Sequence, residues 1–165
     1  LLILAPSNPA RGPDLARTLR KEGWRVALRS ADQDPHEETQ IYIADTEGED
    51  GLWLRLAPIT FLGGTLMPEH TDPADPAAAA ALGSAILHGP HSGPFQLLLR
   101  QLDTARAART VRDAESLART LSLLLAPEKA AELANNAWQV STLGAETTQR
   151  IVQHMLDRLD NAEVA

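Results

Sequence analysis

The chain of 165 residues contains no cysteine, which excludes a disulfide framework and any metal site built on thiolates. Basic residues are scarce too: 15 lysines and arginines stand against 22 aspartates and glutamates, for a formal net charge of -7. Nucleic-acid-binding surfaces need clustered lysine and arginine, so that class of protein is disfavoured. Apolar residues make up 44% of the chain, enough for a folded domain, but no apolar run reaches the length of a membrane-spanning helix.

Several common catalytic motifs are also missing. The sequence has no Gly-x-Ser-x-Gly elbow, no phosphate loop of the Gly-x-x-x-x-Gly-Lys-Ser/Thr type, and no Gly-x-Gly-x-x-Gly after its first apolar run. A triad hydrolase, a P-loop enzyme and an ordinary dinucleotide dehydrogenase are therefore disfavoured. His70, His88 and His91 match no metal-ligand spacing, so they predict no metal site.

What is present is an alternation of short apolar runs and amphipathic segments. We predict six strands, at 1–5, 24–28, 41–45, 59–62, 85–87 and 108–111. Helices are predicted between them, at 13–23, 52–56, 73–81 and 95–102. Three more helices follow from apolar stripes at 117–125, 130–138 and 152–159.

This alternation predicts an α/β fold: a Rossmann-like, doubly wound parallel sheet of about six strands with C-terminal helices. We expect one domain over residues 1–160, strand order 3-2-1-4-5-6, and a frayed tail at 161–165. The last apolar stripe, which includes Met155, packs either on this sheet or against another part of a larger protein; exposure of Met155 favours the second.

Polar loops follow the predicted strands, and ligands of open parallel sheets bind outside the strands' carboxyl ends. The double glycine Gly63-Gly64 lets a backbone approach a ligand closely. With Asp72 as N-cap and prolines at 73 and 76, the free amides of the next helix would be those of Ala74 and Asp75. Thr46 and Glu49 fit a capping box. The loop at 6–12 reads equally well as a plain turn.

Together these segments resemble the C-terminal, nucleotide-binding half of 3-deoxy-D-manno-octulosonic acid (Kdo) transferase, a glycosyltransferase of the GT-B fold. The resemblance rests on five stretches in the same order: APSNPARG at 5–12, DTEGE at 45–49, FLGGTL at 61–66, HTDPADP at 70–76 and LGSAILHGPHSGPF at 82–95. The last stretch is the most specific of the five.

The resemblance implies transfer of Kdo from CMP-Kdo to the lipid A precursor in lipopolysaccharide biosynthesis, without a metal ion or other cofactor. It places the full-length enzyme at the cytoplasmic face of the inner membrane. In that family this half holds the CMP-sugar donor, whereas the acceptor site and the general base lie in an N-terminal half that this chain lacks. We therefore expect a soluble fragment that binds the donor, carries no catalytic residue and does not turn over.

Two loops depart from the family pattern. Where the family has Pro-Arg-His-Pro-Glu-Arg, this chain has Ser7 and Asn8 in place of arginine and histidine and keeps only Arg11. In the helix-opening loop, Asp75 replaces a glutamate. The resemblance implies Glu49 and Asp75 as ribose or base partners, and Ser7, Asn8, Thr65 and the amides near Ala74 on the phosphate side. The full set of expected nucleotide-sugar contacts is Ser7, Asn8, Arg11, Thr46, Glu49, Gly63, Gly64, Thr65, His70, Thr71, Asp75, Pro90 and His91.

Two alternatives stay open. The chain could belong to a GT-B-like enzyme that uses another nucleotide sugar, such as a UDP-sugar epimerase. It could also be a degenerate, non-catalytic paralogue that kept the fold and lost donor affinity. Ser7 and Asn8 favour this last alternative, because neither offers the bidentate cationic fork of arginine.

Overall fold

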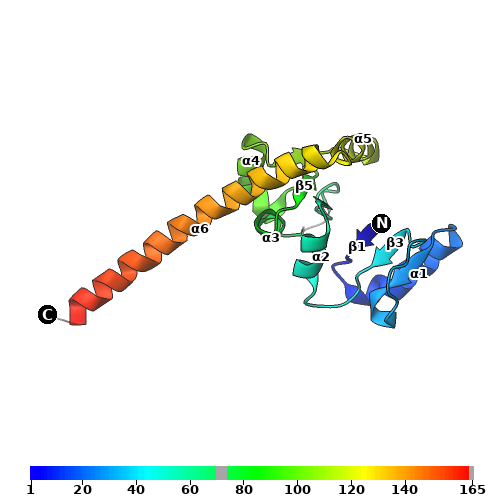
Figure 1. The fold of residues 1–165 in the computed structure, drawn as a ribbon, viewed down its shortest axis with the longest axis horizontal. Coiled ribbons are helices and arrows are strands. Elements are labelled where there is room, and N and C mark those ends of the chain that lie inside the picture. The colour runs from blue at the N-terminus through cyan, green and yellow to red at the C-terminus, as the bar shows by residue number, and fades with distance from the viewer. Residues whose placement is uncertain (70–73, 164–165) are drawn as a thin grey trace. The chain divides into compact units, whose positions relative to one another are not determined.

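The computed structural model describes residues 1–69 and 74–163, without the side chains of 144–150 and 159–163. The chain folds as two compact units, Leu1–Ala57 and Pro58–Ala165 (Figure 1). Among the described residues, no helix is both long and apolar enough to cross a membrane. The α/β class is confirmed, because each unit contains a parallel sheet covered by helices.

The first unit is built on a three-stranded sheet. Its strands are β1 (Leu2–Leu4), β2 (Val26–Leu28) and β3 (Ile41–Ile43), and its helices are η1 (Pro9–Arg11), α1 (Gly12–Lys21), η2 (Arg29–Ala31) and α2 (Asp50–Leu56). The amphipathic helix α1 buries Ala16 against Leu28, Ile41 and Ile43. Trp53 of α2 meets the ring of Tyr42 edge to face at 5.4 Å between ring centroids, which holds α2 on β3.

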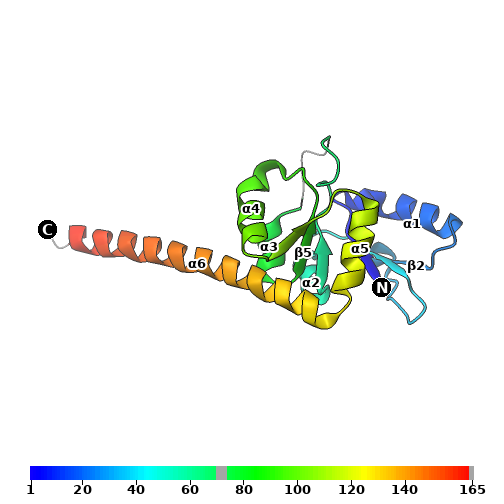
Figure 2. The same ribbon diagram turned by 90° about the horizontal axis from the view of Figure 1, so that it is seen from above.

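The second unit contains the other sheet and most of the helical residues. Its elements are β4 (Ile59–Phe61), α3 (Pro76–Ala81), β5 (Ala85–His88), η3 (Gly93–Phe95), α4 (Gln96–Thr104), β6 (Ala108–Thr110), α5 (Ala114–Leu124) and α6 (Pro127–Glu163). Ala85 and Leu87 of β5 pack on α5 and α6 through Leu124 and Leu133. Helices α3 and α4 lie on the opposite side of β5 from α5 (Figures 1 and 2).

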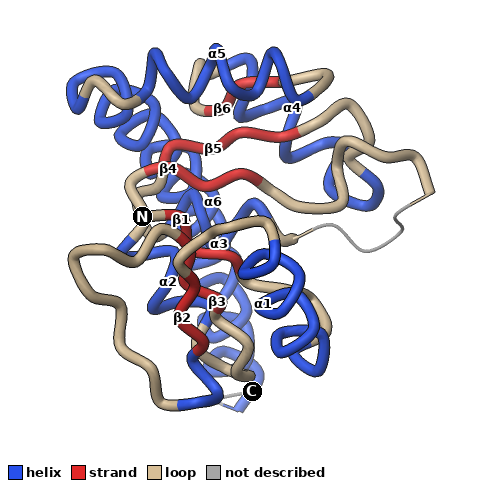
Figure 3. The backbone as a smooth tube through the Cα atoms, turned by 90° about the vertical axis from the view of Figure 1, so that its right-hand side faces the viewer, coloured by secondary structure: helices blue, strands red, loops and turns tan. Residues whose placement is uncertain are grey.

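All six predicted strands are confirmed, but their pairing is not the predicted one. They form two sheets of three, in the orders β1-β3-β2 and β4-β5-β6 (Figure 3). The predicted order 4-5-6 is correct, whereas 3-2-1 is wrong because β3 lies in the middle of its sheet. Every residue of β3 is buried and apolar, as a central strand requires.

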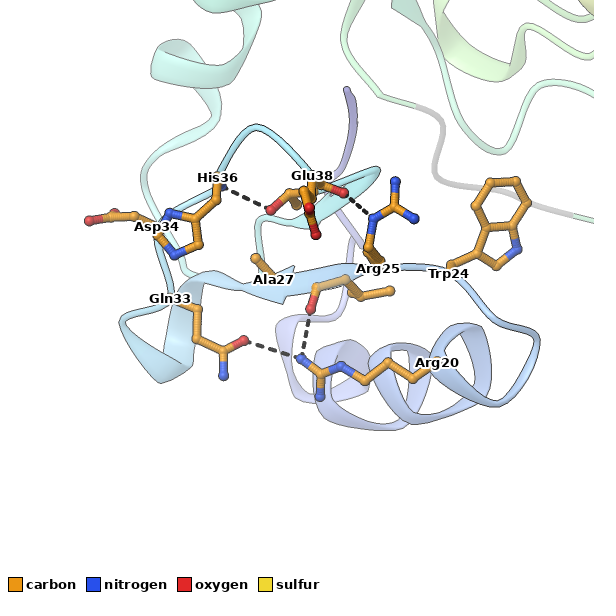
Figure 4. A pocket seen from close by; sticks show the side chains of 10 residues that line it. Arg20, Trp24, Arg25, Ala27, Gln33, Asp34, His36 and Glu38 are labelled. Atoms are coloured by element: carbon orange, nitrogen blue, oxygen red, sulfur yellow. Dashed lines mark hydrogen bonds between the residues drawn. The ribbon is translucent and has the colours of Figure 1, made fainter.

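Strand β2 is an edge strand whose outward main-chain groups are satisfied by side chains. Arg20 donates from Nη2 to the Val26 carbonyl at 2.9 Å and to Gln33 Oε1 at 3.1 Å (Figure 4). The same Gln33 oxygen accepts from the Leu28 N–H at 3.1 Å. These contacts seal the edge against pairing with a further strand. A cavity of about 530 Å³ beside this edge includes Trp24 and His36 in its wall (Figure 4).

The C-terminal helices also differ from the prediction. Instead of three helices there are two, because α6 runs for 37 residues from Pro127 without a break. Gly144 is a weak helix former but does not end the helix. Met155 is 62% exposed and thus does not pack on the sheet of its own unit.

The seal on β2 predicts a stability effect. Gln33→Ala leaves the Leu28 N–H without its acceptor and Arg20 without one partner, so we expect a loss of roughly 1–2 kcal/mol in the free energy of unfolding. Gln139→Ala, at an exposed position of α6, is the matched control and should change it by less than about 0.5 kcal/mol. Urea unfolding measures both. If Gln33→Ala and Gln139→Ala have equal free energies of unfolding, the Gln33 contacts do not stabilise the edge of β2.

Candidate functional site

The loops predicted to bind a ligand follow the carboxyl ends of parallel strands in both units. In the first unit, β1 and β3 are paired neighbours, so the loop that holds Ser7, Asn8 and Arg11 and the loop that holds Thr46 and Glu49 leave the same edge of one sheet. Ser7, Asn8 and Arg11 are exposed. The Asn8 side chain accepts a hydrogen bond from the Ala10 N–H at 3.1 Å and caps η1, so part of its hydrogen-bonding capacity serves the loop itself.

Asp45 follows β3 directly and places a buried carboxylate at this edge of the sheet. It is 5% exposed and accepts hydrogen bonds from the Ser30 N–H at 2.9 Å and the Ser30 hydroxyl at 2.7 Å. Its carboxylate lies so near the start of α1 that a Cβ on Gly12 would come within 2.1 Å of Asp45 Oδ2. Because this carboxylate already complements the positive end of α1, the start of α1 is a poor place for an anion.

Glu49 is held by two partners. Arg29 donates to it through Nε at 3.0 Å and Nη2 at 2.8 Å, and the Thr46 hydroxyl donates to the same carboxylate. The hydrogen bonds from Arg29, and then from Thr46, lower the pKa of Glu49 to about 2, and the pairing with Glu49 raises the pKa of Arg29. The Arg29 and Glu49 side chains are 35% and 27% exposed, so an ionised, oriented carboxylate remains within reach of solvent.

The predicted capping box is wrong, although its two residues do touch. Helix α2 begins at Asp50 with Glu49 as N-cap, and Thr46 binds the Glu49 side chain instead of a helix amide. The sequence analysis missed Arg29, which pairs with Glu49 from 20 positions away. The signal that could have found it is a basic residue directly after the predicted strand at 24–28.

In the second unit, Thr65 joins the loop after β4 to the turn after β5. Its side chain is completely buried; the hydroxyl donates to the Leu62 carbonyl at 2.6 Å and accepts from the Gly89 N–H at 2.7 Å. The Thr65 carbonyl accepts from the His91 N–H at 3.0 Å. A Cβ on Gly89 would lie 2.1 Å from that carbonyl oxygen, so only glycine fits there. We call these three contacts the Thr65 clamp.

The Thr65 clamp determines which groups of the turn at 89–91 face solvent. The main-chain N–H groups of Gly89 and His91 are used internally, while Pro90 and the His91 side chain are exposed. Thr65 itself has its hydroxyl engaged, so its predicted contact with a phosphate stays a prediction. Gly64 has a φ of 78°, a left-handed turn conformation that favours glycine, and Gly63 has open space where a Cβ would lie.

A buried histidine lies next to this turn. His88 ends β5, and its ring contacts the Gly89 carbonyl at 2.8 Å through Nδ1 and Asp103 of α4 at 3.2 Å through Nε2. From the sequence, His88 fits no metal-ligand spacing and is expected to be a structural or surface histidine; the structure shows that it is buried, with Asp103 as a partner that was not predicted. Within the part of the chain that the structure describes, no cluster of three or more histidine, aspartate or glutamate side chains could hold a metal ion.

The loop that opens α3 differs from the prediction. Helix α3 begins at Pro76, and Asp75 is its N-cap, accepting from the Ala77 N–H at 2.8 Å. The predicted start with Asp72 as N-cap is therefore wrong, and the amides of Ala74 and Asp75 do not belong to the first turn. His70, Thr71, Asp72 and Pro73 lie outside the described residues. Asp75 remains exposed, but its carboxylate already serves the helix.

Comparison with known proteins gives a consistent set of relatives. No family model matches the chain. The chain is 36% identical over 106 residues to the probable mitochondrial 3-deoxy-D-manno-octulosonic acid transferase of Arabidopsis thaliana, covering 64% of this chain and 24% of the relative. It is 30% identical over 138 residues to the transferase of Haemophilus influenzae, covering 83% and 32%. For the transferase of Bordetella pertussis the identity is 29% over 163 residues, covering 96% and 37%.

The chain thus spans between about a quarter and little more than a third of the curated relatives it matches. Among solved structures it is similar to the crystal structure of the C-terminal CMP-Kdo binding domain of WaaA from Acinetobacter baumannii. The TM-score is 0.77 with 27% sequence identity, over 84% of this chain and 72% of that one. The chain therefore belongs to the Kdo transferase family, in which it corresponds to the C-terminal domain of a GT-B glycosyltransferase.

Proposed function

We propose that this chain is the donor-binding domain of a Kdo transferase and that it binds CMP-Kdo. The observation that carries the proposal is the similarity, at a TM-score of 0.77 over 84% of the chain, to a domain that binds CMP-Kdo. In the complete protein, this domain would present the donor for transfer of Kdo to a lipid A precursor at the inner membrane. The general base would lie in the N-terminal part, and no metal ion would be needed.

The geometry supports particular roles for two sets of residues. Glu49 is an oriented carboxylate with spare acceptor capacity, which suits the hydroxyl groups of a ribose. Pro90 and His91 are exposed on a turn whose main-chain N–H groups are already hydrogen-bonded to Thr65, so they offer a fixed surface to a ligand. Each set lies at the carboxyl ends of the strands of its own unit, where ligands of parallel sheets bind.

The charge of the donor makes local cations important. A CMP-sugar acid carries a phosphate and a carboxylate, while this chain has a formal net charge of -7. Because Ser7 and Asn8 replace the cationic pair that the resemblance implies, Arg11 and Arg29 are the arginines that follow the carboxyl ends of the strands in the first unit. Arg29 is paired with Glu49, so Arg11 is the exposed arginine we assign to the anionic part of the donor.

Calorimetric titration of the chain with CMP, UMP and UDP tests the proposal. The relative from Acinetobacter baumannii was crystallised as the isolated C-terminal domain, which supports using this chain alone. We expect CMP to bind at least tenfold more tightly than UMP or UDP. A preference for UDP would favour an enzyme that uses another nucleotide sugar, and no binding of any of the three would favour a degenerate domain.

The low pKa of Glu49 predicts a pH dependence of stability. Its folded-state pKa of about 2 lies below the ordinary 4.5, so the stabilisation it provides is complete above pH 4.5 and is lost as the pH falls towards 2. The difference in unfolding free energy between the wild type and Glu49→Gln should therefore be constant from pH 7 to about pH 5 and shrink at lower pH. Urea unfolding at several pH values measures it.

Glu47→Gln is the matched control, because Glu47 is exposed in the same loop. The difference in unfolding free energy between the wild type and Glu47→Gln should not shrink in this way between pH 4.5 and 2. If both variants follow the same pH profile, Arg29 and Thr46 do not hold Glu49 in its ionised form in solution.

A further inference from the structure

We propose that His88 is a positioning residue for donor binding: it holds the Gly89 carbonyl and thereby fixes the turn that presents Pro90 and His91. This inference rests on the proposed function, because it assigns the turn to the donor site. It concerns a residue outside the expected contacts, since His88 is buried and cannot itself reach a ligand.

The contacts of the His88 ring give it one orientation. A carbonyl oxygen can only accept, so Nδ1 carries the hydrogen that is donated to the Gly89 oxygen at 2.8 Å. Nε2 lies 3.2 Å from Asp103 Oδ1 and 3.5 Å from the Thr110 hydroxyl; because a carboxylate oxygen also only accepts, the contact with Asp103 is a hydrogen bond when Nε2 carries a hydrogen as well. Asp103 is held in turn by the Thr110 hydroxyl of β6, which donates to its second oxygen, Oδ2, at 3.2 Å. Side chains from α4 and β6 therefore fix the ring of a residue at the end of β5.

The His88 contact complements the Thr65 clamp. Thr65 holds the N–H groups of Gly89 and His91, whereas His88 holds the Gly89 carbonyl. Pro90 has no N–H group, so these contacts account for every main-chain N–H of the turn from 89 to 91. Without His88, the peptide group between Gly89 and Pro90 loses the only partner that the described residues give its carbonyl. That carbonyl directly precedes the two residues assigned to the donor.

Two substitutions of equal size separate the hydrogen bond from simple packing. Asparagine and leucine have nearly the same shape, and both leave a similar space when they replace histidine. Only His88→Asn places an amide N–H where Nδ1 donates to the Gly89 carbonyl. A purely structural role of the ring would affect both variants alike, whereas a positioning role would be rescued by asparagine alone.

The experiment compares the wild type, His88→Asn and His88→Leu by two measurements: hydrogen exchange of the Gly89 and His91 amides, and calorimetric titration with CMP. We expect His88→Asn to stay within about threefold of the wild type in both. We expect His88→Leu to exchange the His91 amide about tenfold faster and to bind CMP about tenfold more weakly, as loss of one hydrogen bond implies.

The two measurements distinguish the possible failures. Equal amide exchange and equal CMP affinity in His88→Asn and His88→Leu would overturn the positioning role. Faster exchange in His88→Leu alone, with no CMP binding even by the wild type, would leave the positioning role intact and overturn the proposed function. If His88→Leu does not fold, Asp103→Ala decides: its side chain is 36% exposed, so it tolerates truncation, and wild-type exchange and affinity in this variant would overturn the proposal.

Discussion

The hydroxyl of Thr65 is the contact on which the second unit's candidate site depends. This buried hydroxyl accepts a hydrogen bond from the Gly89 N–H and donates one to the Leu62 carbonyl. One side chain therefore connects the ends of the neighbouring strands β4 and β5. The close approach of Gly89 to the Thr65 carbonyl leaves no room for any other residue at 89. Pro90 and His91 are exposed because the main chain beneath them is held from both sides, and this gives the turn a fixed shape in the absence of any ligand.

In the first unit, the question is which cations remain for the anionic donor that we propose, because the chain has a formal net charge of -7. Asp45 makes the start of α1 a poor anion site, and Arg29 is committed to Glu49. In the proposed site, Glu49 would recognise hydroxyl groups and Arg11 would contact the anionic groups. Ser7 and Asn8 are both exposed, so we expect them to affect donor affinity more than the fold.

The sequence predicted the six strands and the relevant loops because short apolar runs and the residues after them are local signals. The predictions were wrong or incomplete where the structure depends on contacts between residues far apart in the chain, or where two local signals are equally strong. Strand β3 pairs with both β1 and β2, while Arg20 and Gln33 bind the outer edge of β2, and these contacts join residues far apart in the chain. Asp72-Pro73 and Asp75-Pro76 are equally good helix starts in the sequence, and the structure uses the second. The pairs Arg29–Glu49 and His88–Asp103 join residues 20 and 15 positions apart. The position of Arg29 directly after a predicted strand marks it as a candidate, but no local pattern gives the partner of either residue.

Mapping CMP-induced changes in the ¹⁵N NMR spectrum of the chain identifies the residues of each unit that respond to the nucleotide. We expect shifts of the amides of Glu49 and His91, with no change in the indole signal of Trp24 beside the cavity at the edge of β2 (Figure 4). Shifts confined to Trp24 and its neighbours, with Glu49 and His91 unchanged at saturating CMP, would contradict this expectation.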